Sequence, residues 1–189
     1  MDYTFKSSTR NLTLGLVAVG LLSILYAVFV DHTPGQRIWA NMLVNSYFFV
    51  GIALMGTLWM AIQYVSEAGW SSGFKRIPEA VSQFLLVGGP ILFLVLISGS
   101  HSIGFHHIYH WMDPALTTVG DPHYDSIIAG KTAYLNEPFF FGRAALYLFI
   151  WIAFTIFFRK ASLKEDIDGG VAIHKRNYGF AAAFLVFYG

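Results

Sequence analysis

Long apolar runs without charge constrain this chain more than any other feature of its sequence. Asn11–Val30 contains no acidic or basic residue, and a helix of about 20 such residues spans a hydrocarbon core of roughly 30 Å. The whole chain is 56% hydrophobic and only 12% charged, whereas soluble domains carry about 25% charge. In a bilayer the backbone must satisfy its own hydrogen bonds. The sequence therefore predicts an all-α integral membrane protein, built as a transmembrane helix bundle.

Polar interruptions divide the chain into a short arm, 1–10, and a transmembrane helical domain, 11–189. Gly88-Gly89-Pro90 predicts a kink in the third apolar run, because Pro90 lacks an N–H and crowds the carbonyl four residues earlier. The final apolar residues, Gly179–Gly189, resemble half a span, so we expect the chain to be the N-terminal part of a longer protein. About five spans are expected, at 11–30, 38–65, 78–103, 138–158 and 178–189 (incomplete), with an outer loop at 104–137 and an inner loop at 159–177.

Lysine and arginine set the expected orientation. Most of them fall on the N-terminal arm and on the connectors after the second and fourth spans, whereas Arg37 and Lys131 lie on the opposite side. Positive residues favour the cytoplasmic side of a membrane. We therefore expect a multi-pass protein with a cytoplasmic N-terminus.

Several classes of function are excluded or disfavoured. The chain has no cysteine, which rules out thiolate-held iron–sulfur clusters, covalent c-type haem and disulfides within it. Its basic residues follow membrane topology and form no patch for nucleic acid. The histidines near the membrane lie on one element, so a b-type haem with axial histidines on its two opposite faces is disfavoured. His106 and His110 have the spacing of a metal pair but lack a third ligand, so no metal site is predicted.

The stretch Ser98–Pro114 places four of the seven histidines where the third span leaves the membrane. Ionisable groups at that depth suggest function, and His101 is the deepest. A histidine paired with a carboxylate can accept protons from a quinol. The second and fourth spans bring further polar groups to the same depth. The outer candidates for a quinone or proton site are His101, Asn45, Arg143, Glu137 and Asp113.

A second polar set is expected at the inner side, where the second span ends and the third begins. Two pairs there are spaced four residues apart, which places each pair on one helix face. The connector between the helices is short, so they should be antiparallel neighbours. The candidates for an inner proton path are Gln63, Glu67, Glu79 and Gln83.

Each of these features also has a structural explanation. Asn41 and Asn45 are typical of interhelical hydrogen bonding, and Arg143 is typical of a side chain that snorkels or pairs with a carboxylate. Glu67 and Glu79 fit a solvated position near the headgroups. The Gly-Gly-Pro segment also fits close helix packing.

Three segments resemble one membrane-protein family: Arg37–Ala80, His106–Pro114 and Lys131–Leu148. They are similar to membrane subunits of alternative complex III, a bacterial quinol:cytochrome c oxidoreductase, and closest to its F subunit. These subunits are themselves similar to the NrfD/PsrC-type membrane subunit of polysulfide reductase. The resemblance implies an NrfD-like four-helix bundle with a flanking helix, in the bacterial inner membrane. It also implies that this chain is the N-terminal half of a protein with about ten spans.

The resemblance also implies partners and cofactors. The expected partners are an NrfD-like paralogue, an iron–sulfur subunit, c-type cytochromes and membrane lipids. Haem and iron–sulfur clusters would belong to those partners, whereas this chain would bind none covalently and could meet only a quinone or quinol.

Three functions remain open at this point. The first is a respiratory subunit without its own redox centre, which contributes a quinone-facing surface or a proton path. The second is a scaffold that docks extracytoplasmic subunits through His106, His107, His110 and Trp111. The third is a secondary transporter with a broken third helix.

Overall fold

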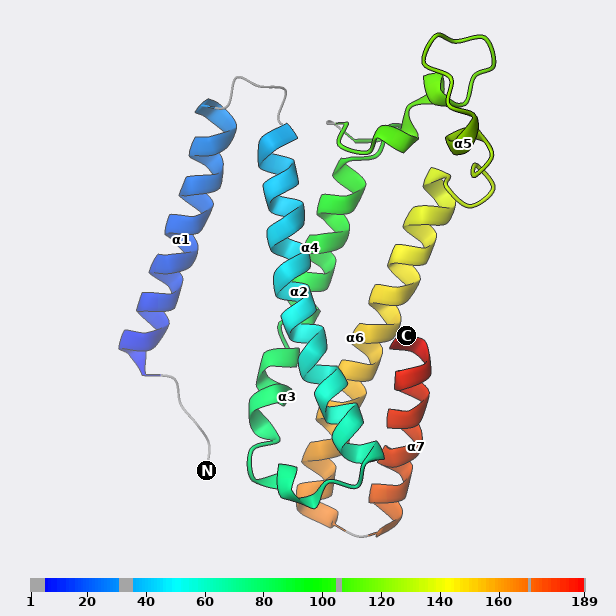
Figure 1. Cartoon of the computed structure of the whole chain (residues 1–189). Coiled ribbons are helices and arrows are strands. Elements are labelled where there is room, and N and C mark those ends of the chain that lie inside the picture. Colours follow the sequence, from blue (N-terminus) through cyan, green and yellow to red (C-terminus); the bar gives the residue numbers. More distant parts are fainter. Residues whose placement is uncertain (1–5, 31–35, 105–106, 170, 189) are drawn as a thin grey trace.

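The structure, a computed structural model, describes residues 6–30, 36–104, 107–169 and 171–188 (Figure 1). Every regular element in these ranges is a helix. The long ones are α1 (Ser7–Val30), α2 (Gln36–Val65), α4 (Leu85–Ser98), α6 (Glu137–Asp168) and α7 (Val171–Tyr188). Shorter helical segments are η1 (Gly69–Gly73), α3 (Arg76–Ser82), η2 (His110–Met112), η3 (Pro114–Leu116) and α5 (Ser126–Ala129).

Four helical stretches in the described residues are long and apolar enough to cross a membrane: Ser7–Val30, Arg37–Val65, Arg76–Ser98 and Glu137–Asp168. The third combines α3 and α4. The predicted all-α membrane bundle is thus confirmed. The start expected for a fifth span lies within α7, which is not among these four stretches.

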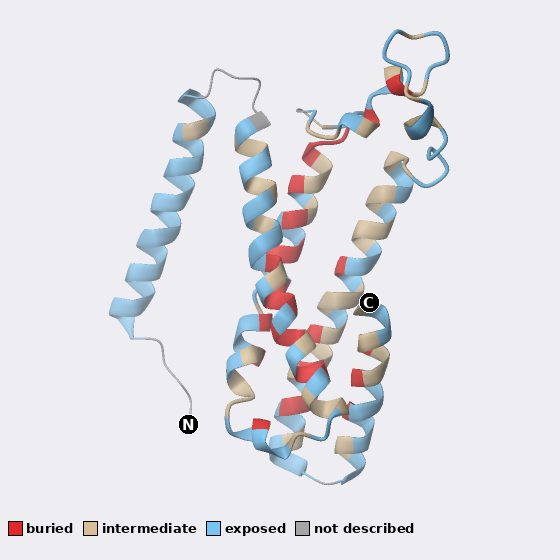
Figure 2. Cartoon of the chain, viewed as in Figure 1, coloured by how far each residue is buried: buried red, intermediate tan, exposed pale blue. Residues whose placement is uncertain are grey.

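Helix α2 is the centre of the bundle, since it packs against α3, α4, α6 and α7. Figure 2 shows the buried residues gathered along these contacts. Leu85 of α4, Phe158 of α6 and Phe184 of α7 are fully buried in this core. A hydrogen bond of 2.7 Å joins the buried hydroxyls of Thr57 and Thr155, so α2 and α6 are also linked by a polar contact.

Helix α1 stands beside this bundle (Figure 1). None of its residues is buried, although its mean hydropathy of 2.4 is the highest of the four stretches. A helix with apolar side chains on every face is stable in a lipid or protein environment rather than in water. Helix α1 therefore takes the place of a flanking helix.

The two ends of the bundle differ in character. One end, called here the long-loop end, carries the segment 99–136 with η2, η3 and α5. The other, called here the basic end, carries Lys75, Arg76 and Arg159, together with the turn at Gly169 between α6 and α7. Positive residues indicate that the basic end is the one expected in the cytoplasm.

The third span differs from its prediction in two respects. It ends at Ser98, not Ile103, and its break lies at Gln83–Phe84, before the Gly-Gly-Pro segment. The amides of Leu86 and Val87 donate to carbonyls three residues back, in a tighter turn than an α-helix. The break in the third span therefore lies before the Gly-Gly-Pro segment, and α4 continues through Pro90.

The two glycines serve close packing. A Cβ added to Gly88 would lie 3.1 Å from Val50 of α2, and one added to Gly89 would lie 3.1 Å from Ile152 of α6. The structural explanation of the Gly-Gly-Pro segment, close approach of helices, is therefore confirmed.

Helix α6 is longer than the predicted fourth span, and helices occupy most of the expected inner loop at 159–177. Helix α6 continues to Asp168, and α7 begins at Val171. Hydropathy marks where apolar residues end, but polar residues with high helix propensity extend the helix beyond that point. Gly169 stops α6 because its φ of 61° is readily adopted only by glycine.

Gly56 offers a test of the packing of α2 against α3. A Cβ at this position would lie 2.6 Å from the backbone oxygen of Pro78, so Gly56→Ala should force the helices apart. We expect a loss of roughly 1–3 kcal/mol in stability. Gly51→Ala is the control, because no atom lies within 4 Å of its added Cβ. Thermal unfolding in detergent, followed by circular dichroism, measures both; equal melting temperatures would contradict this packing.

Candidate functional site

A buried ion cluster occupies the basic end. The side chain of Glu79, in α3, is only 1% exposed. Its Oε2 accepts hydrogen bonds of 2.5 Å from Nη1 of Arg76, one turn earlier, and from Nη1 of Arg159 in α6. A buried carboxylate requires such partners, because an unpaired charge in a low-dielectric interior is costly. The expectation of a solvated Glu79 is therefore wrong, since Arg159 lies on a helical extension that hydropathy did not reveal.

The cluster continues along α6. Arg76 also pairs through Nη2 with Asp166, and Nζ of Lys75 lies 2.7 Å from Oδ1 of Asp166. Both cations therefore reach from the start of the third span to the last turns of α6. These contacts fix the short connector between α2 and α3 against α6.

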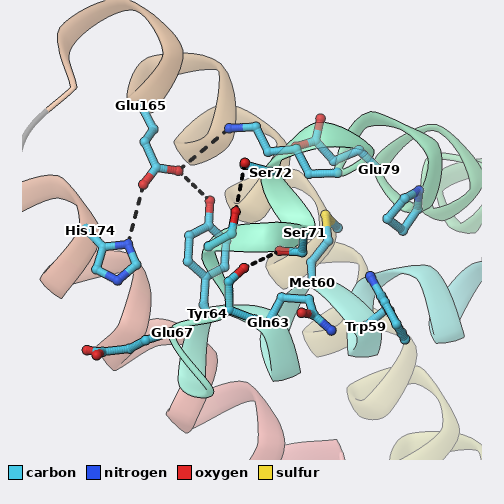
Figure 3. Close-up of a pocket in the computed structure, with 14 residues that line it drawn as sticks. Trp59, Met60, Gln63, Tyr64, Glu67, Ser71, Ser72, Glu79, Glu165 and His174 are labelled. Atoms are coloured by element: carbon cyan, nitrogen blue, oxygen red, sulfur yellow. Dashed lines mark hydrogen bonds and ion pairs between the residues drawn. The ribbon is translucent and has the colours of Figure 1, made fainter.

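Glu165 is the centre of a second group of contacts, which involves helices α2 and α7 and the connector before α3 (Figure 3). Its carboxylate accepts a hydrogen bond of 2.8 Å from the hydroxyl of Tyr64 in α2. Nδ1 of His174 in α7 lies 3.6 Å from the other carboxylate oxygen, Oε1. Nζ of Lys75 lies 3.9 Å from Oε2, the oxygen that Tyr64 binds. Stacking on Phe158, at 6.2 Å between ring centroids, holds the Tyr64 ring in place. A phenol, a carboxylate and an imidazole thus meet at one point.

These groups line a cavity of about 200 Å³. Figure 3 shows Glu67, Glu165 and His174 on one side of it and Trp59 on the other. Gln63, Glu67 and Glu79 of the predicted inner set all line the cavity. Gln83 does not line the cavity. Its side-chain amide donates a hydrogen bond to the backbone oxygen of Glu79.

Two buried amide groups add polar character to this region. Oε1 of Gln63 is buried and has no hydrogen-bond partner among the described residues. Asn177 is fully buried, and neither of its amide atoms has a partner among them. Asn177 follows His174 by three residues and so lies on the same face of α7. Buried polar atoms of this kind are commonly satisfied by ordered water.

At the long-loop end Glu137 has a structural role. Its carboxylate accepts hydrogen bonds from the backbone N–H groups of His101 and Ser102, at 2.5 and 3.2 Å. The hydroxyls of Ser102 and Ser100 donate to it at 2.5 and 3.3 Å. These contacts tie the start of α6 to the turn that follows α4. The carboxylate is thus already engaged and is a poor candidate for a mobile proton acceptor.

The other outer candidates do not converge on Glu137. The His101 side chain is exposed and lies three residues beyond the end of α4. Asn45 donates to the carbonyl of Asn41 in its own helix, at 2.8 Å. Asp113 accepts from the amide of Ala115 and caps η3. Arg143 donates to the carbonyl of Phe139. Because Asn45, Asp113 and Arg143 each bond to nearby backbone rather than to one another, no quinone step follows from this set.

The docking candidates lie on the segment 99–136. His107 and His110 are exposed, and Trp111 is half-buried against Phe140, with 5.3 Å between ring centroids. His106 lies outside the described residues. Among the residues that the structure does describe, no cluster of three His, Asp or Glu side chains has the geometry of a metal site.

The sequence alone did not reveal Tyr64, Glu165 or His174. The last two fell in the expected inner loop, so nothing suggested that they face the bundle. The signal for Glu165 was the polar spacing of Arg159–Asp168, which continues a helical pattern after the apolar run.

Comparison with known proteins does not assign this chain to a family. No protein-family model matches the chain, and no curated protein matches it significantly. The function is therefore inferred from the chain's own residues.

Glu79→Gln tests the ion cluster. The substitution keeps the shape of the side chain but leaves two guanidinium groups without a counter-charge. Both arginine side chains are partly exposed, so we expect a loss of about 2 kcal/mol, less than for a fully buried pair. Glu67→Gln is the matched control, because Glu67 is exposed and its carboxylate has no ion pair among the described residues. Similar melting temperatures for the two variants in detergent would show that the cluster contributes no stability.

Proposed function

We propose that this chain is the membrane subunit of a respiratory quinol:cytochrome c oxidoreductase in a bacterial inner membrane. In this proposal it has no redox centre of its own, and it supplies a proton path that opens in the cavity at the basic end. Two observations support this assignment: the resemblance of Arg37–Ala80, His106–Pro114 and Lys131–Leu148 to NrfD-like subunits, and the fold, a bundle with one flanking helix.

The contact group around Glu165 is the observation that carries the proposal. Carboxylate and imidazole groups are common proton carriers in membrane proteins. Here a carboxylate is hydrogen-bonded to the phenol of Tyr64 and lies 3.6 Å from His174, beside a cavity. A proton that enters the cavity can bind at His174 or Glu165. The buried amide of Asn177, one helical turn further along α7, gives water a polar position deeper in the bundle.

The ion cluster pairs two of the carboxylates near this path with cations. Glu79 is neutralised by Arg76 and Arg159, and Asp166 is neutralised by Arg76 and Lys75. Glu165 has only a distant cation, the ammonium of Lys75 at 3.9 Å. Of these three carboxylates, Glu165 is therefore the one whose charge is least compensated by a fixed cation, and its hydrogen bond to Tyr64 and its closeness to His174 suit it to exchange a proton.

The proposed orientation follows from the positive residues. The basic end faces the cytoplasm, and the cavity takes protons from that side. Quinol oxidation belongs to the NrfD-like paralogue, and electrons pass through the iron–sulfur and c-type cytochrome subunits.

A scaffold is the second candidate. Exposed His107 and His110 on the segment 99–136, and a first helix without a buried residue, offer surfaces for partner subunits. In this alternative the chain holds the complex together and moves no proton.

Glu165→Gln in the assembled complex distinguishes the proton path from the scaffold. The amide keeps a hydrogen-bond acceptor for Tyr64 but cannot carry a proton at neutral pH. For a proton path we expect quinol-driven proton uptake in proteoliposomes to fall about tenfold or more, as for loss of an acid–base group. Asp168→Asn is the control, because Asp168 is exposed and its one ion pair among the described residues is with Lys164, at 3.8 Å.

Assembly is followed on native gels in the same preparations. Normal proton uptake by an intact Glu165→Gln complex would contradict the proton path and favour the scaffold. Loss of uptake in Asp168→Asn as well would show that the effect is not specific to the cavity.

A further inference from the structure

Arg143 is a charged residue inside an apolar, membrane-spanning helix. It lies six residues after the start of α6, about 9 Å along the helix axis, in a stretch with a mean hydropathy of 1.8. Phe139, Phe140, Phe141 and Leu146 surround it in the sequence. A guanidinium group at this depth is costly unless it reaches a polar layer or a counter-charge.

The guanidinium group is held in one place. Its Nε donates to the backbone oxygen of Phe139 at 3.3 Å. Its Cζ lies 3.8 Å from the centre of the Tyr134 ring and 4.6 Å from that of the Phe139 ring. Cation–π contacts of this kind fix orientation as well as position. Both contacts draw the side chain towards the long-loop end, because Tyr134 lies just before α6.

The charge of Arg143 has no counter-ion among the described residues. None of their carboxylates lies within ion-pair distance of it. Glu137, at the start of the same helix, is engaged by Ser100, His101 and Ser102 instead. The terminal nitrogens of the guanidinium therefore present a fixed set of hydrogen-bond donors near the membrane surface.

We propose that Arg143 binds the phosphate of a phospholipid in the leaflet at the long-loop end. A guanidinium fork matches phosphate oxygens in a bidentate arrangement, and the long arginine side chain reaches from the apolar layer to the headgroups. The aromatic rings of Tyr134 and Phe139 are 58% and 45% exposed. Aromatic side chains are typical of this interfacial layer.

The surface below Arg143 favours a lipid over a free anion. Phe139, Arg143 and Leu146 follow each other at helical spacing, so they share one face of α6. Leu146 is 55% exposed and lies deeper in the membrane than Arg143. Phe149, one turn further, is 70% exposed. This apolar surface accommodates an acyl chain beneath the phosphate, a contact that inorganic phosphate cannot make.

Native mass spectrometry of the purified protein, released from nanodiscs that contain phosphatidylglycerol and diacylglycerol, tests this proposal. Wild type should retain phosphatidylglycerol and not diacylglycerol, and Arg143→Gln should retain about tenfold less, as for a lost charged hydrogen-bond pair. Arg37→Gln is the control, because Arg37 is an exposed arginine at the same end of the bundle. Millimolar inorganic phosphate should not displace the lipid.

A second variant guards against misfolding. Tyr134→Leu removes one aromatic ring from an exposed segment while the charge remains, and it should lower retention about threefold. Equal retention of phosphatidylglycerol by wild type and by both variants would overturn the proposal. Equal retention of diacylglycerol, or displacement by inorganic phosphate, would overturn it too. Release of a partner subunit from the complex by Arg143→Gln, with lipid retention unchanged, would instead identify a protein carboxylate as the partner.

Discussion

The buried carboxylate of Glu79 is the interaction on which the basic end depends. It lies where α3 meets α6, and two arginines from different helices share its charge. Because a buried charge without a counter-ion is unstable, moving either helix would expose Glu79 to solvent or leave it without its arginine partners. The same arginine, Arg76, and its neighbour Lys75 reach Asp166, which fixes the connector after α2. Tyr64 and Glu165 thereby meet at one cavity, together with His174 from α7.

Apolar run lengths predicted the helices well, because in a bilayer the helix is one of very few structures that satisfies its own backbone. The inner polar set was also predicted in part, since Gln63, Glu67 and Glu79 share the cavity. The end of α6 and the burial of Glu79 were not predictable from the same pattern. Hydropathy reports contact with lipid, whereas the last turns of α6 are polar and pack against other helices. Which helices touch is a property of the tertiary fold, so Arg159 and Glu165 could not be assigned to their partners.

At the long-loop end, by contrast, the polar residues predicted to lie at one depth do not come together. Shared depth suggested a common site for His101, Asn45, Asp113, Glu137 and Arg143. Short polar side chains bond readily to nearby backbone, and Asn45, inside α2, and Asp113, at the start of η3, do so here. Glu137 binds the turn after α4, and Arg143 is held by aromatic rings. One end of the bundle thus gathers a carboxylate, a phenol and an imidazole at a cavity, while the polar groups at the other end bond to nearby backbone or pack on aromatic rings.

The central claim is that a water-accessible cavity opens between α2, α6 and α7 at the basic end. The chain has no cysteine, so single cysteines can report access directly. Gln63→Cys, in the cavity, should react with a membrane-impermeant maleimide added on the cytoplasmic side of membrane vesicles. Ile52→Cys, exposed on the outer surface of the same helix, should not react, because lipid excludes the reagent. Labelling of Gln63→Cys only from the opposite side, or equal labelling of both cysteines, would contradict the claim.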